Sequence, residues 1–388
     1  MKLTLAACLL FLAINAHGQD VSATQRPNTK SRTVRAAVPH GMAYIPSGTM
    51  VMQEGSGPAT RTIQMLGFYM DKNEVSNQEY RQFVTWVRDS IANDLLGNHK
   101  TMADGSQRLD MKRIDWQDAA VQAKLAPIYR SGAPAGKSDV NPATLVYHYK
   151  WFDYRNSMVP HPNEKTVIKY VHSENVPVYP DTTVWSRNGG ANYNDPIAAQ
   201  YFWFHGFNYY PAVGVSVPQC LAFCNWRTVL WKEEKRNEGE LTEANFRLPT
   251  EEESELAAKG GSNDVVVHTQ IPFLAKPDAG GFIANASASS SENKYGLRKL
   301  GGVVSEWTAT AAGGAGDPAD ALFKDNSNKW VDVATSPAAD KHMQIVRGSN
   351  WMNEASGQNI GNRFAYPKDS SAAYIGFRCV FTQVLTGK

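Results

Sequence analysis

The sequence has little net charge, few cysteines and none of the short motifs that mark common active sites. Across 388 residues, 39 Lys and Arg stand against 37 Asp and Glu, a formal charge of +2. This balance gives no electrostatic reason to expect a nucleic-acid partner. The HExxH zinc motif, the EF-hand loop, the phosphate-binding glycine loops and the Gly-x-Ser-x-Gly elbow are all missing from the sequence. The sequence therefore offers no active site of the kinds that these motifs build.

Cysteine is scarce, and its positions bear on redox chemistry. The four cysteines are Cys8, Cys220, Cys224 and Cys379. Loss of Cys8 with an export signal would leave three, an odd number for an oxidising compartment. Cys220 and Cys224 are four residues apart on a predicted helix, which is a poor geometry for a disulfide between them. The favoured partner of either one is therefore the distant Cys379.

The N-terminus predicts export. Lys2 precedes an apolar core and then small residues that suit cleavage, which identifies residues 1–18 as a secretory signal peptide. The same stretch also resembles a bacterial lipobox in which Cys8 would carry lipid, although the apolar run continues past the cysteine. Residues 19–40 are polar and without periodicity, so we expect a flexible leader. No later apolar run approaches the length that spans a bilayer.

Capping boxes predict three helices in the folded part. The pattern Ser/Thr-x-x-Glu/Gln, in which two side chains bond to orphan amides at a helix start, begins at Ser76, Ser216 and Thr250. Behind Ser76, apolar residues recur on an arc of about 120°, which is typical of a core-facing helix. They are Tyr80, Phe83, Val84, Val87, Ile91 and Leu95. Residues 42–52 have the pattern of two short strands joined by a turn. Helices separated by long stretches of loop and short strands indicate a loop-rich α+β domain.

A long stretch at about 98–210 is dense in aromatic residues, and its last part is our best candidate for an interface, on composition alone. That part contains Tyr201, Phe202, Trp203, Phe204, Phe207, Tyr209 and Tyr210. Clustered aromatic side chains line sugar- or peptide-binding grooves and protein interfaces. They also close loops over a hydrophobic core. The sequence leaves these interpretations open.

Nine short segments follow one another in a specific order. They are Met42–Gly48, Asn73–Val84, Tyr210–Ser216, Phe223–Trp226, Arg247–Glu251, Tyr295–Leu297, Ser305–Thr308, Arg347–Trp351 and Gly376–Cys379. In this order they resemble the formylglycine-generating enzyme (sulfatase-modifying factor) superfamily, whose fold is related to C-type lectins. The resemblance covers about 42–381. It implies a single α+β domain at 41–388, with the aromatic-rich stretch at about 98–210 as a long insertion.

A closer resemblance lies in residues 79–91, 179–185 and 224–228. These segments look like GldK/PorK, Bacteroidetes proteins of gliding motility and type IX secretion. Membership of that family implies an outer-membrane lipoprotein on the periplasmic side that forms a large ring with GldN/PorN. The lipobox around Cys8 departs from the family pattern, because too few residues precede the cysteine.

The superfamily's oxidases use two cysteines, five residues apart, that hold copper through their soft thiolates. In this chain the two positions fall on Asn353 and Gln358, after Arg347–Trp351. An amide does not replace a thiolate, and nothing in the chain supplies the three-histidine set of the iron-dependent relatives. The resemblance therefore implies a protein that is not an enzyme and that has no metal or other cofactor for catalysis.

The resemblance implies two further features. The family's structural cysteines resemble Cys224 and Cys379, which implies a disulfide that closes the domain. Cys220 would then be a small buried apolar residue, the commonest role of a free cysteine. Glu306 stands where the superfamily has a calcium ligand, although the residues before it differ from the usual Gly-Asn-Val. Calcium is the one cofactor that the resemblance leaves open.

These observations together predict a non-catalytic structural subunit of a type IX secretion or gliding ring. We expect it to be exported to the periplasm and associated with the inner face of the outer membrane. The expected partners are further copies of the chain and a GldN/PorN-like protein. Two alternatives are a degenerate glycan- or peptide-binding module and a metal-dependent oxidoreductase of the superfamily whose ligands the sequence does not reveal.

Overall fold

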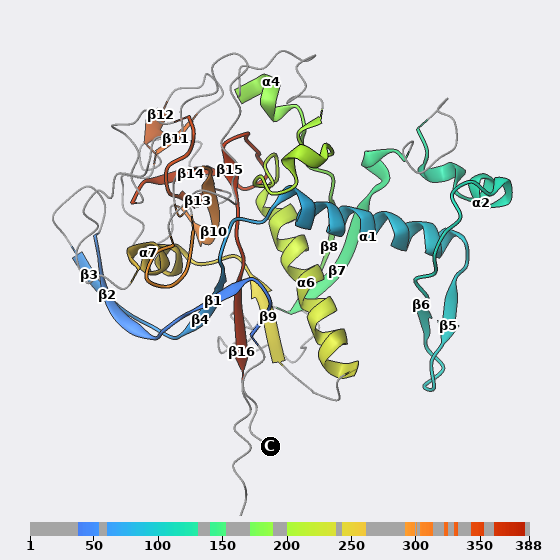
Figure 1. Cartoon of the computed structure of the whole chain (residues 1–388), viewed down its shortest axis with the longest axis horizontal. Coiled ribbons are helices and arrows are strands. Elements are labelled where there is room, and N and C mark those ends of the chain that lie inside the picture. Colours follow the sequence, from blue (N-terminus) through green and yellow to red (C-terminus); the bar gives the residue numbers. More distant parts are fainter. Residues whose placement is uncertain are drawn as a thin grey trace, which may run out of the picture. The chain divides into compact units, whose positions relative to one another are not determined.

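Helices and strands alternate irregularly along the chain, which confirms the α+β class (Figure 1). The computed structural model describes residues 38–53, 60–130, 140–152, 171–188, 200–237, 243–260, 292–298, 300, 303–312, 322–324, 330–332, 343–352 and 361–384. The predicted signal peptide (1–18) and nearly all of the predicted leader (19–40) lie outside these residues. Within them, no helix is both long and apolar enough to span a membrane.

A four-stranded antiparallel sheet joins the two ends of the described chain. Its strands, in spatial order, are β1 (Met42–Ile45), β4 (Phe68–Asp71), β16 (Val380–Val384) and β9 (Glu243–Arg247). In the central strand β16, Phe381 lies opposite Tyr69 on β4 and Phe246 on β9. The ring centroids of Phe381 and Phe246 are 4.8 Å apart, and such cross-strand aromatic pairs stabilise a sheet. The C-terminal strand is thereby fixed between strands from distant parts of the sequence.

A six-stranded mixed sheet holds most of the C-terminal part. Its strands, in spatial order, are β12 (Trp330–Asp332), β11 (Leu322–Lys324), β14 (Arg363–Pro367), β13 (Met343–Arg347), β10 (Ser305–Ala311) and β15 (Ile375–Gly376). The ladder between β10 and β13 shifts register between Trp307 and Ala311. Trp307 is fully buried, and its indole N–H donates to the Val215 carbonyl oxygen at 3.0 Å. This sheet is therefore anchored to the segment that precedes the second long helix.

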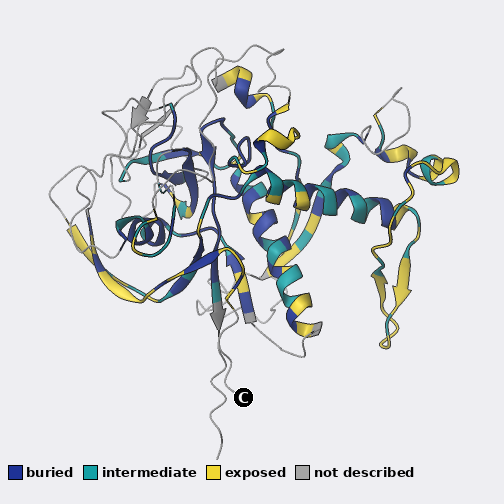
Figure 2. Cartoon of the chain, viewed as in Figure 1, coloured by how far each residue is buried: buried dark blue, intermediate teal, exposed yellow. Residues whose placement is uncertain are grey.

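Three hairpins complete the strands. They are β2 (Gly48–Gln53) with β3 (Thr60–Met65), β5 (His99–Thr101) with β6 (Gln107–Leu109), and β7 (Val146–Phe152) with β8 (Val171–Pro177). Figure 2 shows that β5, β6 and parts of β2 and β3 are exposed. The two strands predicted within residues 42–52 are present, but they do not pair with each other. β1 pairs with β4 and β2 pairs with β3, so they belong to different sheets.

Five helices lie in the described residues, with three short 3-10 turns. The helices are α1 (Asn77–Leu95), α2 (Ala119–Lys124), α4 (Val184–Asn188), α6 (Val217–Asn237) and α7 (Glu251–Lys259), and the turns are η1 (Ala126–Ile128), η3 (Pro142–Thr144) and η5 (His205–Phe207). The predicted capping boxes at Ser76 and Thr250 are present with both reciprocal hydrogen bonds. At Ser216 the backbone N–H donates to the Gln219 side chain at 2.8 Å. All three helices predicted from these patterns are confirmed.

Aromatic packing joins α1 and α6 to the segment that leads into β16. Tyr80 on α1 stacks on Phe223 of α6 with ring centroids 5.7 Å apart. Phe377 meets Phe223 edge to face at 5.5 Å. These rings are almost completely buried, and aromatic pairs of this geometry add about 0.5–1.5 kcal/mol each beyond the burial of their area. The two long helices are thus held against the same C-terminal segment.

Candidate functional site

The polar centre of the domain is a fully buried arginine, Arg378, just before β16. Its guanidinium donates to both carboxylate oxygens of Glu306 on β10, at 2.7 and 2.6 Å. It also donates to the carbonyl oxygens of Asp71 and Arg298, at 3.0 and 3.2 Å. Burial alone lowers the pKa of Arg378, but the ion pair with Glu306 outweighs burial and the net pKa is raised. The group therefore stays charged inside the protein.

A second ion pair lies beside the first and shares β4 with it. The Asp71 carboxylate accepts hydrogen bonds from Arg227 on α6, at 2.7 and 3.1 Å, and from the Cys379 backbone N–H at 2.9 Å. The Arg227 guanidinium also lies 4.3 Å from the centroid of the Phe246 ring. Burial lowers the pKa of Arg227, and the pairing with Asp71 more than reverses this effect. The ion pairs Asp71–Arg227 and Glu306–Arg378 together connect α6, the four-stranded sheet and the six-stranded sheet.

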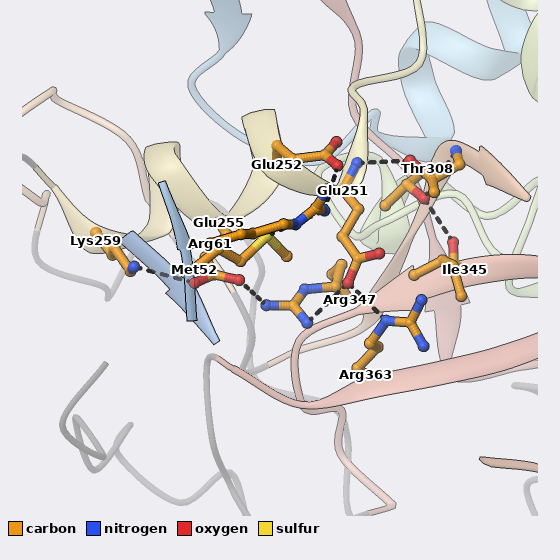
Figure 3. Close-up of polar contacts among 11 residues, drawn as sticks. Met52, Arg61, Glu251, Glu252, Glu255, Lys259, Thr308, Ile345, Arg347 and Arg363 are labelled. Atoms are coloured by element: carbon orange, nitrogen blue, oxygen red, sulfur yellow. Dashed lines mark hydrogen bonds and ion pairs between the residues drawn. The ribbon is translucent and has the colours of Figure 1, made fainter. Parts of the chain in front are cut away.

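A third charged cluster fixes the start of α7 to the six-stranded sheet (Figure 3). Glu251 accepts hydrogen bonds from Arg347 at 3.3 Å and from Arg363 at 2.7 Å. Glu255 accepts from Arg347 at 2.8 Å and pairs with Lys259 at 3.0 Å. Each carboxylate here is neutralised by at least one cation. The cluster therefore stabilises the fold and leaves no free carboxylate for acid–base chemistry.

The structure places the predicted calcium ligand in an ion pair. Both oxygens of Glu306 are used by Arg378, and the Glu306 side chain is only 6% exposed. A calcium ion needs several oxygen ligands at about 2.3–2.6 Å, so it would have to displace the guanidinium. Across the described stretches of the chain, no group of three or more His, Cys, Asp and Glu side chains is arranged to hold a metal ion.

The three described cysteines lie in the core. The Sγ atoms of Cys224 on α6 and Cys379 are 3.4 Å apart, and all three are free thiols in the structure. Burial raises the pKa of the Cys220 thiol, and burial together with the contact to Cys224 raises that of Cys379. The structure thus brings together the two residues expected to form a disulfide. The disulfide itself stays a prediction.

The predicted aromatic interface divides into two groups. Tyr201, Phe202 and Phe207 are buried in the core, where the Tyr201 hydroxyl donates to the Pro211 carbonyl oxygen at 2.7 Å. These three side chains are covered by the domain itself and cannot meet a partner directly.

The exposed group contains Trp203, Phe204 and Tyr209, with exposed fractions of 45%, 54% and 59%. Tyr210 is partly buried and packs against the core. The interface prediction is therefore limited to the exposed trio, Trp203, Phe204 and Tyr209.

The two positions that correspond to catalytic cysteines, Asn353 and Gln358, lie outside the described residues. The chain just before them is well packed. Trp351 is buried, stacks on Trp185 with ring centroids 5.9 Å apart, and donates its indole N–H to the Ala373 carbonyl oxygen at 3.1 Å. Trp351, two residues before Asn353, is therefore held by aromatic stacking and by one hydrogen bond of its own indole.

Sequence reasoning missed the pairing of Glu306 with Arg378 and that of Asp71 with Arg227. A signal for the first was present. Arg378 is the only charge in the apolar run Ile375–Phe381, and Glu306 stands directly before a tryptophan. An isolated charge within an apolar segment indicates a buried and paired group, because an unpaired charge is rarely buried. The sequence gives no means to choose the partner of either residue.

Two curated relatives match part of the chain. The bovine (Bos taurus) protein named inactive C-alpha-formylglycine-generating enzyme 2 is 28% identical over 190 residues, which cover 44% of this chain and 50% of the relative. The mouse (Mus musculus) protein of the same name is 27% identical over 189 residues, covering 44% and 48%. The matched part therefore spans about half the length of these relatives.

Solved structures match a larger share of the chain at low similarity. The crystal structure of CarF is 13% identical with a TM-score of 0.40, and the match covers 89% of this chain and 98% of CarF. PvdO from Pseudomonas aeruginosa is 14% identical with a TM-score of 0.39, and the match covers 88% and 93%.

A family model also matches most of the chain. The model of the sulfatase-modifying factor enzyme 1-like domain matches residues 27–132 and 164–383. Its single interruption, between 132 and 164, falls within the predicted insertion at 98–210. Because the matched residues make up most of the 388-residue sequence, the chain belongs to the family of sulfatase-modifying factor enzyme 1-like domains.

Proposed function

We propose that this protein is a non-catalytic member of its family that works as a structural part of an assembly. The observation that carries the proposal is the residue pair Asn353 and Gln358, which stand where the superfamily's oxidases have their two copper-binding cysteines. Amide side chains do not supply the soft thiolates that hold Cu(I). The matched bovine and mouse relatives carry the word inactive in their names, which supports the same conclusion for this chain.

The chemistry of the described cysteines also supports the proposal. A reactive cysteine is partly exposed and has a lowered pKa, because the thiolate is the nucleophile and the metal ligand. Cys220 and Cys379 have the opposite properties, since both are fully buried and burial raises their pKa. Cys224 is also buried. These three thiols suit a structural role.

The assembly that we propose is the ring of type IX secretion or gliding motility. Support comes from the GldK/PorK-like segments at 79–91, 179–185 and 224–228. The chain would be exported by residues 1–18, with a flexible leader at 19–40, and would associate with the periplasmic face of the outer membrane. Its partners would be copies of itself and a GldN/PorN-like protein. The relation of its fold to C-type lectins stays a prediction.

The exposed trio is the surface that we propose for contact within the assembly. Aromatic residues are enriched at the centres of protein interfaces and are depleted from ordinary surfaces. Trp203, Phe204 and Tyr209 are exposed within seven residues of one another. Three large rings that face solvent from one short segment are better explained by a partner than by the fold of the single chain.

The test is a pull-down of the tagged full-length protein from its native envelope in mild detergent. Native electrophoresis gives the particle size, and mass spectrometry identifies the partners. We expect a megadalton particle that contains a GldN/PorN-like protein. Recovery of the wild-type chain as a free monomer would refute the ring proposal.

A matched pair of variants tests the surface. The triple variant Trp203→Ser, Phe204→Ser and Tyr209→Ser should release the chain from the particle. The control is Leu66→Ser together with Trp151→Ser, which removes exposed apolar side chains (85% and 40% exposed) elsewhere on the domain. Loss of the particle in both variants, or in neither, would show that the exposed trio is not the contact surface.

A further inference from the structure

A small cavity of about 20 Å³ lies where α7 meets the strands β10 and β13. Ser254 and Glu255 line it from α7, Glu306 from β10 and Arg347 from β13. The cavity therefore borders both the Glu306–Arg378 ion pair and the charged cluster at the start of α7. A water molecule needs about 10–15 Å³ of such space, so the cavity has room for a single water and for no larger ligand.

Two opposite charges that line the cavity face each other across neighbouring strands. Glu306 and Arg347 are register partners in the antiparallel pair of β10 and β13, a position in which the Cβ atoms are about 4.5–5.5 Å apart. The Glu306 carboxylate nevertheless accepts from Arg378, at 2.7 and 2.6 Å. The Arg347 guanidinium donates to Glu251 at 3.3 Å and to Glu255 at 2.8 Å (Figure 3). A small polar molecule in the cavity would lie within reach of both charges.

Two buried polar atoms of the lining residues have no hydrogen-bond partner within the described part of the chain. They are the Nε atom of Arg347 and the Oγ atom of Ser254. The two residues are 8% and 6% exposed. Buried polar atoms in native proteins are almost always hydrogen-bonded, either to the protein or to an ordered water. Both atoms therefore need a partner that the described residues do not supply.

The mixture of charges around the cavity selects a neutral ligand. The Arg347 guanidinium disfavours a cation in the same space, and the carboxylates of Glu255 and Glu306 disfavour an anion. A molecule that both accepts and donates hydrogen bonds suits this lining. Each carboxylate oxygen has two lone pairs, so Glu306 can accept from such a molecule while it stays bonded to Arg378.

We propose that this cavity binds one ordered water molecule. The water accepts a hydrogen bond from the Arg347 Nε–H, donates one to the Glu306 carboxylate and shares one with the Ser254 hydroxyl. This number agrees with buried waters in general, which make about three hydrogen bonds each. The water joins the two charged clusters into one network that runs from Arg378 on one side to Glu251 on the other. The proposal needs only the single folded chain, so it does not rest on the ring assignment.

The direct test is a crystal structure of the purified full chain at a resolution that shows ordered waters. We expect one solvent peak within about 3.2 Å of both Arg347 Nε and Ser254 Oγ, with a further contact to a Glu306 oxygen. Well-ordered side chains with no such peak between them would overturn the proposal. A direct hydrogen bond between Arg347 Nε and Glu306 would overturn it as well.

A matched pair of variants tests the site in solution. Ser254→Thr keeps the hydroxyl, whereas Ser254→Val has nearly the same shape and lacks it. With the water bound, the hydroxyl has a partner, and the valine variant should unfold at a lower urea concentration than the threonine variant. Without the water the order reverses, because a buried hydroxyl that lacks a partner is unfavourable. A valine variant as stable as the threonine variant, or more stable, would therefore contradict the proposal.

The control is the same pair of substitutions at Ser186, which is exposed on α4 and outside the cavity lining. Ser186→Thr and Ser186→Val should unfold at nearly the same urea concentration, since an exposed hydroxyl bonds to bulk water in both the folded and the unfolded chain. An equal difference between valine and threonine at the two positions would show that the cavity is not its source and would overturn the proposal.

Discussion

Replacing Glu306 by glutamine should destabilise the domain by about 3 kcal/mol. The Arg378 guanidinium would keep its charge in a fully buried position, lose the opposing charge, and face an amide NH2 group in place of one of the two carboxylate oxygens that now accept from it at 2.7 and 2.6 Å. Breaking a buried ion pair from one side costs about 3–5 kcal/mol. Asp71 and Glu74 also attract Arg378, so some counter-charge remains and the loss should lie at the lower end of this range.

The reverse change, Arg378→Met, should cost more. It leaves the Glu306 carboxylate buried without its cation, and it also removes the donor for the carbonyl oxygens of Asp71 and Arg298. Each buried acceptor that loses its donor costs about 1–3 kcal/mol. The double variant Arg378→Met with Glu306→Met removes the unpaired carboxylate, so it should recover the electrostatic part of the lost stability. It should not recover the part that comes from the carbonyl oxygens left without a donor.

Urea unfolding followed by tryptophan fluorescence measures these differences. The control is Glu292→Gln, which breaks an ion pair with Arg298 whose side chains are 45% and 39% exposed. Surface pairs contribute about 0–1 kcal/mol, so this variant should unfold close to the wild type. If Glu306→Gln and Glu292→Gln shift the urea midpoint equally, the buried pair is not an important source of stability and the reasoning fails.

Three further changes have defined outcomes. Oxidation of Cys224 and Cys379 to a disulfide should close a loop of 155 residues and stabilise the domain by about 4–5 kcal/mol. Equal urea midpoints with and without reductant would count against the disulfide. Burial raises the pKa of Tyr147 to about 12, so the neutral phenol is favoured in the folded state. The free energy of unfolding that this preference contributes is lost as pH rises from about 10 to 12. Tyr147→Phe should therefore flatten the fall in urea midpoint between these pH values. Thr250→Ala should cost about 1 kcal/mol through loss of the hydroxyl that accepts from the Glu253 N–H, whereas Thr250→Ser should be nearly neutral.

The helices could be predicted because their signals are local. Ser76 and Glu79 form the predicted capping box within a single turn, and Thr250 does the same at α7. The apolar stripe of α1 holds for Tyr80 and Phe83, which are fully buried, and fails at Leu95, which is 40% exposed. Burial at the end of a helix depends on what packs there, and periodicity carries no information about that.

The strand pairing could not be predicted because the partners are distant in sequence. Residues 42–52 contain the two strands expected, but a hairpin between neighbours was the wrong topology. β1 pairs with β4, and β4 in turn pairs with β16, about 310 residues further along the chain. Strand propensity marks a segment as extended, whereas its partner is set by packing across the whole domain.

The family, the α+β class, the capped helices and the amides at positions 353 and 358 could all be predicted without the structure, because each is encoded in residue identity or short-range spacing. The tertiary structure decided which rings of the segment 201–210 are buried and which face solvent. It also decided that Arg378 pairs with Glu306. Burial and charge pairing depend on groups far apart in the chain that only the folded packing brings into contact.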